Sequence, residues 1–245
     1  MKLNKISSGA MRRGLQGHLK VAANYTLYIT GVVAIIAACS AVMAIGQSGP
    51  PPGGQPSQPG QTGQAPDWRT ILAGPPPILT IDRPQTKTDG ELKVTSASFG
   101  PNGEIPTKCT SYGQSISPEV SWTKGPQGTA SYVLIMEDAS AGMDRKGVLH
   151  WMAFNIPSEV TSLPEGLPQT PTGMIVANNR EGKAIYVGPH APAGAPPFHY
   201  QVEIFALDKN LDLAAAATRE DLWDAMNGHV LAKGGVTGTF QGPVK

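Results

Sequence analysis

An aspartate and a histidine are the residues whose setting in the sequence most resembles a chemical site. Asp138 closes the apolar stretch SYVLIMED, and His150 lies in GVLHWMAFNIP, where apolar residues run into an Asn-Ile-Pro turn. If these stretches are neighbouring strands joined by ASAGMDRKG, the carboxylate and the imidazole lie at one end of a sheet. A carboxylate beside an imidazole fixes the tautomer of the ring and favours its cationic form. The pair is then either a small-anion site or a structural Asp–His contact.

A proline- and glycine-rich stretch supplies a third component. Residues 186–200 read YVGPHAPAGAPPFHY, a composition that disfavours regular structure. We expect this loop to lie over the same end of the sheet as a rigid wall with exposed backbone N–H groups. Such a wall above a His–Asp pair suits a small anion.

Short strands separated by turns are predicted for most of the chain from Glu91 to Phe240. The strand-like stretches are LKVTSAS, EVSW, SYVLIME, VLHWMAFNI, IYVG and HYQVEIFAL. Residues 219–232 instead have helical spacing, and Thr218 is suited to cap that helix. Strands and helices do not alternate, which argues against a parallel α/β sheet. The predicted fold is mainly β, with two packed antiparallel sheets and a late helix.

The N-terminal part of the chain predicts export. Residues 1–25 form a basic leader without acidic residues, and residues 26–46 carry no charge. At ~1.5 Å per residue, the uncharged segment spans about 30 Å, the thickness of a bilayer core. Basic residues before such a segment keep the N-terminus cytoplasmic. We therefore expect a transmembrane signal-anchor in the inner membrane and a periplasmic domain, with signal-peptide cleavage or lipidation at Cys39 as alternatives.

A linker is predicted between the membrane segment and the domain, over residues 47–84. Residues 49–66 lack large apolar and charged side chains, so they cannot bury enough surface to fold. Trp68, Ile71 and Leu72 could form a helical turn or two, which the three prolines at 75–77 would end. The folded domain is then expected over residues 85–245.

Composition argues against several classes of function. The net charge is +1, and the five basic residues that precede the first acid, Asp67, leave 14 basic against 18 acidic residues in the remainder. A mildly acidic body has no electrostatic footprint for nucleic acid. His150, His190 and His199 match no compact metal-binding spacing. We expect neither a metal nor a cofactor.

Several spaced motifs together resemble one known family. They are SPEVSW (117–122), MED followed by ASAG (136–142), HW then NIP (150–157), YVGP with its continuation (186–194), HYQVEIFALD (199–208) and LWDAMNGHVLA (222–232). In this order, over roughly residues 91–240, the chain resembles the phosphatidylethanolamine-binding protein family and its bacterial Raf-kinase-inhibitor-like branch. The resemblance implies a fold of two antiparallel sheets. It also implies a shallow pocket for phosphate-like or carboxylate anions.

The resemblance also assigns residues to that pocket. The implied ligand-binding set is Asp138, His150, Gly188, Pro192, Phe198 and Tyr200. The first two stand where the family has its signature aspartate and its pocket histidine, and Gly188 and Pro192 match the pocket-lining loop. Phe198 departs from the pattern, because the family has a second histidine there. His199 is expected to face the opposite way, since neighbouring strand residues alternate; His190 is an alternative replacement.

These observations predict an exported, non-enzymatic binding domain for a small anion or a phospholipid headgroup. One alternative is a protein-interaction module, resembling a kinase or protease inhibitor, that acts through its surface; Phe198 favours this alternative. Another is a hydrolase that uses Asp138 and His150 as an acid–base pair. Ser140 is the nearby hydroxyl for such a reaction, but no motif marks it as an activated nucleophile.

Overall fold

Two β-sheets form the body of the molecule. The computed structural model describes residues 67–143, 145–167 and 173–244. A six-stranded sheet has the order β2-β9-β8-β4-β5-β7, and a three-stranded sheet has the order β1-β3-β6. The strands are β1 (Val94–Thr95), β2 (Gly103–Glu104), β3 (Val120–Trp122), β4 (Ser131–Met143), β5 (Lys146–Pro157), β6 (Ser162–Leu163), β7 (Ile175–Val176), β8 (Phe198–Leu207) and β9 (Val230–Phe240).

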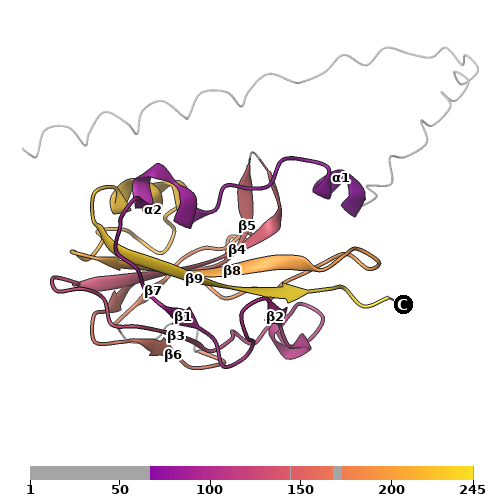
Figure 1. The fold of residues 1–245 in the computed structure, drawn as a ribbon, viewed down its shortest axis with the longest axis horizontal. Coiled ribbons are helices and arrows are strands. Elements are labelled where there is room, and N and C mark those ends of the chain that lie inside the picture. The colour runs from indigo at the N-terminus through magenta and orange to yellow at the C-terminus, as the bar shows by residue number, and fades with distance from the viewer. Residues whose placement is uncertain (1–66, 144, 168–172, 245) are drawn as a thin grey trace, which may run out of the picture. The chain divides into compact units, whose positions relative to one another are not determined.

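The large sheet has a covering layer on each face. Figure 1 shows it edge-on, with helix α2 (Arg219–Met226) on one side and β1, β3 and β6 on the other. One apolar cluster lies between the sheets and includes Trp122, Tyr132 and Tyr200. A second cluster lies on the opposite face and includes Ile135 and Leu222. Alternate residues of the central strands therefore pack into two separate cores. The two sheets confirm the predicted mainly β fold.

The late helix is shorter than its sequence pattern predicts. Thr218 caps it, and its hydroxyl and the Asp221 carboxylate exchange hydrogen bonds with each other's backbone N–H groups. The helix ends at Met226, and Gly228 follows with a φ of +79°. This left-handed backbone, which glycine adopts at little cost, turns the chain into β9. The predicted helix over 219–232 is thus wrong beyond Met226.

The strand pattern departs from the prediction in two further places. β9 pairs with β8 along its whole length and with the short β2 in parallel, so the large sheet is not wholly antiparallel. The predicted strand IYVG (185–188) is an extended loop instead. Its backbone donates one hydrogen bond to the β5 backbone here, from the Val187 N–H to the His150 carbonyl at 3.0 Å.

The segment before residue 85 belongs to the folded domain. Helix α1 (Trp68–Leu72) confirms the predicted helical turn. Beyond it, the short 3₁₀ helices η1 (Thr80–Asp82) and η2 (Pro84–Thr86) lie on the α2 side of the large sheet. Thr80 is fully buried and its N–H donates to Glu137 at 2.7 Å. The linker boundary at residue 84 is therefore wrong, because residues 78–86 pack on the sheet.

The predicted leader, the membrane segment 26–46 and the first part of the linker lie outside the described residues. Within residues 67–143, 145–167 and 173–244, no helix is both long and apolar enough to cross a bilayer.

Candidate functional site

A β-bulge in β5 sets the position of His150. Met136 of β4 pairs with Trp151, but the next residue, Glu137, pairs with Leu149, so His150 is an extra residue without a partner in β4. Regular alternation would place its ring on the Glu137 face of the sheet. The bulge instead brings the ring against Tyr200 of β8, with centroids 5.3 Å apart and an interplanar angle of 85°. Bulges commonly re-aim a side chain in this way beside functional sites.

His150 is held as a neutral imidazole. Its Nδ1 lies 2.8 Å from the Val187 carbonyl, and its side chain is only 1% exposed. Burial lowers the pKa of His150 to about 4, although the Val187 carbonyl opposes the shift. The predicted cationic form, stabilised by Asp138, is therefore wrong. Since a carbonyl oxygen only accepts hydrogen bonds, Nδ1 carries the proton and Nε2 presents a lone pair.

Asp138 lies across the sheet from Tyr200, which pairs with it in β8. One oxygen of the carboxyl group accepts the backbone N–H of Ser140 at 2.7 Å and that of Ala141 at 3.0 Å. Burial raises the pKa of Asp138 to about 7, while these two hydrogen bonds and the charge of Arg180 oppose the rise. Asp138 and His150 thus lie around the same tyrosine, as the predicted strand pairing requires, but each side chain is bound to backbone rather than to the other.

β8 supplies alternating residues to the site. Phe198 and Tyr200 are 2% and 0% exposed, while His199 between them faces solvent. His199 contacts Ser140, whose hydroxyl accepts the backbone N–H of His199 at 2.9 Å. The opposite facing of His199 agrees with the alternation expected from the sequence. The hydroxyl considered as a nucleophile therefore contacts His199.

The proline- and glycine-rich loop holds the site from one side. Gly188 lies so close to the 109–111 backbone that a Cβ there would come within 2.5 Å of the Thr110 carbonyl carbon. Pro192 is half-buried, and its carbonyl accepts the Ala195 N–H at 3.2 Å in a tight turn. The loop is thus closely packed at Gly188 and turns at Pro192, and both contacts are made by backbone atoms.

The rim of the site contains residues that the sequence pattern did not single out. Arg180 is exposed, and its backbone N–H donates to the Leu149 carbonyl, next to His150. Its positive charge lowers the pKa of Asp138, where it opposes the effect of burial. It also lowers the pKa values of His150 and His190, where it adds to the effect of burial. Burial has the larger effect in all three cases. No spacing rule in the sequence could have found Arg180, because a loop 30 residues beyond His150 carries it here.

His190 and Tyr112 form the aromatic part of the rim. Their rings stack, with centroids 5.0 Å apart, and His190 Nδ1 lies 2.9 Å from the Ser111 hydroxyl. Tyr112 also approaches Phe240, at 5.7 Å between centroids, and Phe240 pairs with Phe198 across β8 and β9. His190 therefore borders the site, but its ring is engaged by Tyr112 and does not replace the missing histidine at position 198.

Two polar atoms of the site have no hydrogen-bond partner among the described residues. They are His150 Nε2 and the Tyr200 hydroxyl, each on a side chain no more than 1% exposed. Burial raises the pKa of Tyr200 well above its ordinary value, and the nearby Asp138 adds to that shift. The backbone of His190 lies close enough to the hydroxyl to oppose the shift, although it makes no well-aligned hydrogen bond with it. An unpartnered buried polar atom costs roughly 1–3 kcal/mol, so native proteins rarely keep one without a reason. Here two such atoms occur on rings in contact.

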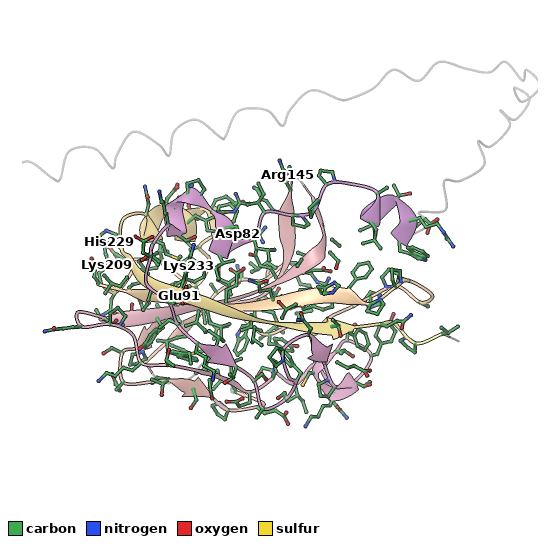
Figure 2. The ribbon with its side chains drawn as sticks, in the orientation of Figure 1. Asp82, Glu91, Arg145, Lys209, His229 and Lys233 are labelled. Carbon is green, nitrogen blue, oxygen red and sulfur yellow. The ribbon has the colours of Figure 1, made fainter. Side chains whose placement is uncertain are left out.

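Two hollows open elsewhere on the described residues. One, of about 790 Å³, lies on the α2 face along β9 and is bordered by Asp82, Glu91 and Lys233, which Figure 2 labels. The other, of about 360 Å³, is lined by Trp151 and Tyr186. Neither is lined by Asp138, His150 or Tyr200. The candidate site is instead marked by the two unpartnered polar atoms, His150 Nε2 and the Tyr200 hydroxyl.

The described residues contain no cluster of three or more His, Cys, Asp or Glu side chains that could hold a metal ion. The side chains of the site offer hydrogen-bonding groups and aromatic faces, with Arg180 as a nearby exposed cation.

Comparisons with known proteins agree on one family. A profile described as "Phosphatidylethanolamine-binding protein" matches residues 95–241, more than half of the chain. A UPF0098 protein of Methanothermobacter thermautotrophicus is 35% identical over 61% of this chain and 99% of its own length. A UPF0098 protein of Aquifex aeolicus is 36% identical over 61% of this chain and 88% of its own length.

Solved structures give the same result. A phosphatidylethanolamine-binding protein homologue from Chlamydia trachomatis matches with a TM-score of 0.57 and 29% identity, covering 63% of this chain and 99% of its own. The E. coli protein YbcL matches with a TM-score of 0.57 and 26% identity, covering 62% and 99%.

Proposed function

Because the chain belongs to the phosphatidylethanolamine-binding protein family, we propose that it is a binding domain for a small phospholipid-headgroup ligand. The ligand contacts Asp138, His150 and Tyr200, beneath the loop that contains Gly188 and Pro192. The observation that carries this proposal is the pair of unpartnered buried atoms, His150 Nε2 and the Tyr200 hydroxyl. A ligand that hydrogen-bonds to both atoms offsets the cost of burying them.

The charges around the site favour a zwitterionic headgroup such as phosphorylethanolamine. An acidic group, Asp138, lies in the depth of the site at 4% exposure, whereas the cation Arg180 is exposed at the rim. A ligand with one cationic and one anionic end can match both groups. We expect binding rather than catalysis, because Asp138 and His150 are each engaged by backbone groups and Ser140 contacts His199.

Titration calorimetry of the full chain with phosphorylethanolamine tests this function. Tyr200→Phe removes only the hydroxyl, and we expect it to weaken binding about five- to twentyfold, the value of one neutral to charge-assisted hydrogen bond. His199→Ala is the matched control on the same strand, and it should leave binding unchanged because that side chain faces away. Equal effects of the two substitutions would place the ligand elsewhere, and no detectable binding to the full chain would reject the function.

We also propose that the domain acts outside the cytoplasm, tethered through residues 26–46. The support is the uncharged length of that segment and the basic leader before it. A reporter that is active only outside the cytoplasm, fused after Lys245, should be active. Activity of a cytoplasmic reporter at the same position would contradict this topology.

A further inference from the structure

The larger of the two hollows lies along β9, on the α2 side of the large sheet. Its floor is formed by residues 233–237 of β9 and by Gln201 of β8, and residues of the 81–92 segment form its wall. Figure 2 labels three of the charged side chains that line it, Asp82, Glu91 and Lys233. Its volume of about 790 Å³ is within the range of small-molecule binding sites.

The floor of the hollow has open hydrogen-bonding groups of the backbone. On the outer edge of β9, the backbone of Lys233 exchanges two hydrogen bonds with residues 90–92, at 2.8 and 3.1 Å. The Thr237 carbonyl on the same edge accepts the Asn102 N–H at 2.7 Å. Gly235 lies midway, so its N–H and carbonyl point to this edge as well, where no backbone group of the described residues pairs with them. Because Gly235 is exposed and lines the hollow, this donor and this acceptor are open to a ligand.

A buried carboxyl group adjoins the floor. Glu203 pairs with Gly235 across β8 and β9, and its Oε2 accepts the Ile81 N–H at 3.0 Å. Since Gly235 and Ile81 both line the hollow, the carboxyl group lies beside it. Its Oε1 is buried and has no hydrogen-bond partner among the described residues. Burial raises the pKa of Glu203, and the charges of Glu137 and Asp82 add to that rise, which places Asp82 near the same carboxyl group. A ligand that reaches Oε1 would offset the cost of burying it.

The rim of the hollow is negatively charged. Asp82, Asp89 and Glu91 are exposed, and within the described part of the chain none of them forms an ion pair. The cation among the described lining residues is Lys233, and its ammonium group donates to the Ile81 carbonyl at 2.6 Å. Three carboxylates against one ammonium group leave two negative charges without compensation. The lining therefore favours a cationic ligand.

The acids are spread along the hollow rather than gathered at one point. Within the described ranges, no three His, Cys, Asp or Glu side chains lie close enough together to hold a metal ion. The floor runs along β9 from Lys233 to Thr237, roughly 13 Å at the rise of a strand. A compact ion such as Mg²⁺ contacts few of these carboxylates at once. A linear polyamine, whose ammonium groups are separated by methylene chains, matches charges that are spread in this way.

From these observations we propose that the hollow is a second binding site, for a linear polyamine of the spermidine type. Its ammonium groups pair with Asp82, Asp89 and Glu91, and one of them also donates to the Gly235 carbonyl. The site does not depend on the headgroup function proposed above. The residues of the headgroup site belong to the layer between the sheets, whereas the hollow lies on the α2 side.

Calorimetry of the full chain with spermidine, putrescine and magnesium chloride, at one ionic strength, tests the proposal. We expect spermidine to bind more tightly than the shorter putrescine, and Mg²⁺ to bind most weakly. Asp82→Asn, Asp89→Asn and Glu91→Gln should each weaken spermidine binding about two- to fivefold, the usual value of an exposed ion pair. Together they should weaken it about ten- to a hundredfold. Glu159→Gln removes an exposed acid that does not line the hollow, and it is the control.

Replacing Lys233 tests the sign of the effect. Lys233→Met removes the ammonium group from the lining and should tighten spermidine binding about two- to fivefold. Because this side chain also donates to the Ile81 carbonyl, thermal melting must show that the variant stays folded. Lys233→Gln keeps a donor for that carbonyl and should tighten binding in the same direction.

Four outcomes would overturn the proposal. They are no detectable binding of spermidine, equal affinities for spermidine and Mg²⁺, an effect of Glu159→Gln as large as those of the three hollow substitutions, and weaker spermidine binding in both folded Lys233 variants. None of these outcomes bears on the headgroup function, which is tested with phosphorylethanolamine.

Discussion

Two neighbouring residues of β4 belong to buried polar clusters on opposite faces of the large sheet. Asp138 faces the layer between the sheets, together with His150 and Tyr200, where two polar atoms lack partners. Glu137 faces α2, and its carboxylate accepts from the Thr80 N–H and from Arg219. Both acids are buried, with Glu137 0% and Asp138 4% exposed. They differ in their partners, because Glu137 is bound to distant segments of the chain whereas Asp138 is bound to backbone N–H groups of its own strand.

The Glu137 cluster fastens separate segments to the sheet. Arg219, at the start of α2, bonds both Glu137 and the Gly147 carbonyl, the latter at 2.6 Å. Glu203 of β8 accepts the Ile81 N–H at 3.0 Å, and burial, with the nearby charge of Glu137, raises the pKa of Glu203 well above its ordinary value. Most charges in this cluster thus hold η1 and α2 in place. Glu203 Oε1 and Arg219 Nε also lack hydrogen-bond partners among the described residues, so this cluster is recognised as structural by the separate segments that its partnered atoms join.

The largest expected effect in this comparison is on stability, from Arg219→Met. The substitution leaves the buried carboxylate of Glu137 without its ion-pair partner, and removing one partner of a buried ion pair costs about 3–5 kcal/mol. Urea unfolding of the full chain measures the loss. Lys183→Met, which breaks a solvent-exposed pair with Glu181, is the control and should cost at most about 1 kcal/mol. Similar losses in both variants would show that the Arg219 cluster is not structural.

A smaller effect on stability should follow from replacing Asp138, the acid of the candidate site. The folded-state pKa of Asp138 is about 7, above its ordinary value of 3.8. Between these pH values the folded chain holds a proton that the unfolded chain has lost, so this carboxyl group makes stability fall as the pH rises. Asp138→Asn should therefore stabilise the ligand-free protein, by on the order of 2–3 kcal/mol at pH 8.

The measurement is the difference in unfolding free energy between Asp138→Asn and the wild-type chain at pH 4, 6 and 8. The difference is needed because His150 contributes the opposite slope: its pKa is lowered to about 4, so its contribution falls as the pH drops below its ordinary value of 6.5. We expect the stability of the variant relative to the wild-type chain to increase progressively from pH 4 to pH 8. A difference that is constant with pH would mean that Asp138 is not a buried acid with a raised pKa.

Much of the fold was predictable from periodicity and from the family resemblance. The stretches that became β4, β5 and β8 have dense apolar patterns, and Thr218 is a recognisable cap. β9 was missed because its central residues, Lys233, Gly234 and Gly235, have weak strand preference, and pairing with β8 decides its structure instead. Residues 185–188 were wrongly assigned as a strand, since their apolar side chains are buried without a ladder of hydrogen bonds.

The proximity of three of the predicted residues was foreseeable, but their charge states were not. The positions of Asp138, His150 and Tyr200 followed from the resemblance, and the outward facing of His199 followed from alternation. The neutral state of His150 depends on a bulge and on the carbonyl of Val187, 37 residues away in sequence. Arg180 likewise reaches the rim through a loop. Such contacts are set by tertiary structure, which local spacing does not encode.

The next prediction concerns the proline- and glycine-rich loop at Gly188. Gly188 has no room for a side chain, because a Cβ would lie 2.5 Å from the Thr110 carbonyl carbon and 2.7 Å from the Cys109 carbonyl oxygen. Gly188→Ala should cost about 1–3 kcal/mol by forcing two backbone segments apart. Gly100→Ala is the control, as a Cβ there meets nothing within 4 Å. A chemical-denaturation midpoint that is equal for the two variants would show that the loop is not rigidly packed.

The smallest effect concerns the cap that supports the structural cluster. The Thr218 hydroxyl accepts the backbone N–H of Asp221 at 3.1 Å, and Arg219, the first residue of the helix, is the cation of Glu137. Thr218→Ala removes the cap and should cost about 1 kcal/mol, the usual value for such a substitution. Thr218→Ser retains the hydroxyl and should recover most of that loss in thermal melts of the full chain. Because Arg219 would be less well positioned, Thr218→Ala in an Arg219→Met background should cost less than it does alone. Full additivity of the two losses would instead mean that the cap and the ion pair act independently.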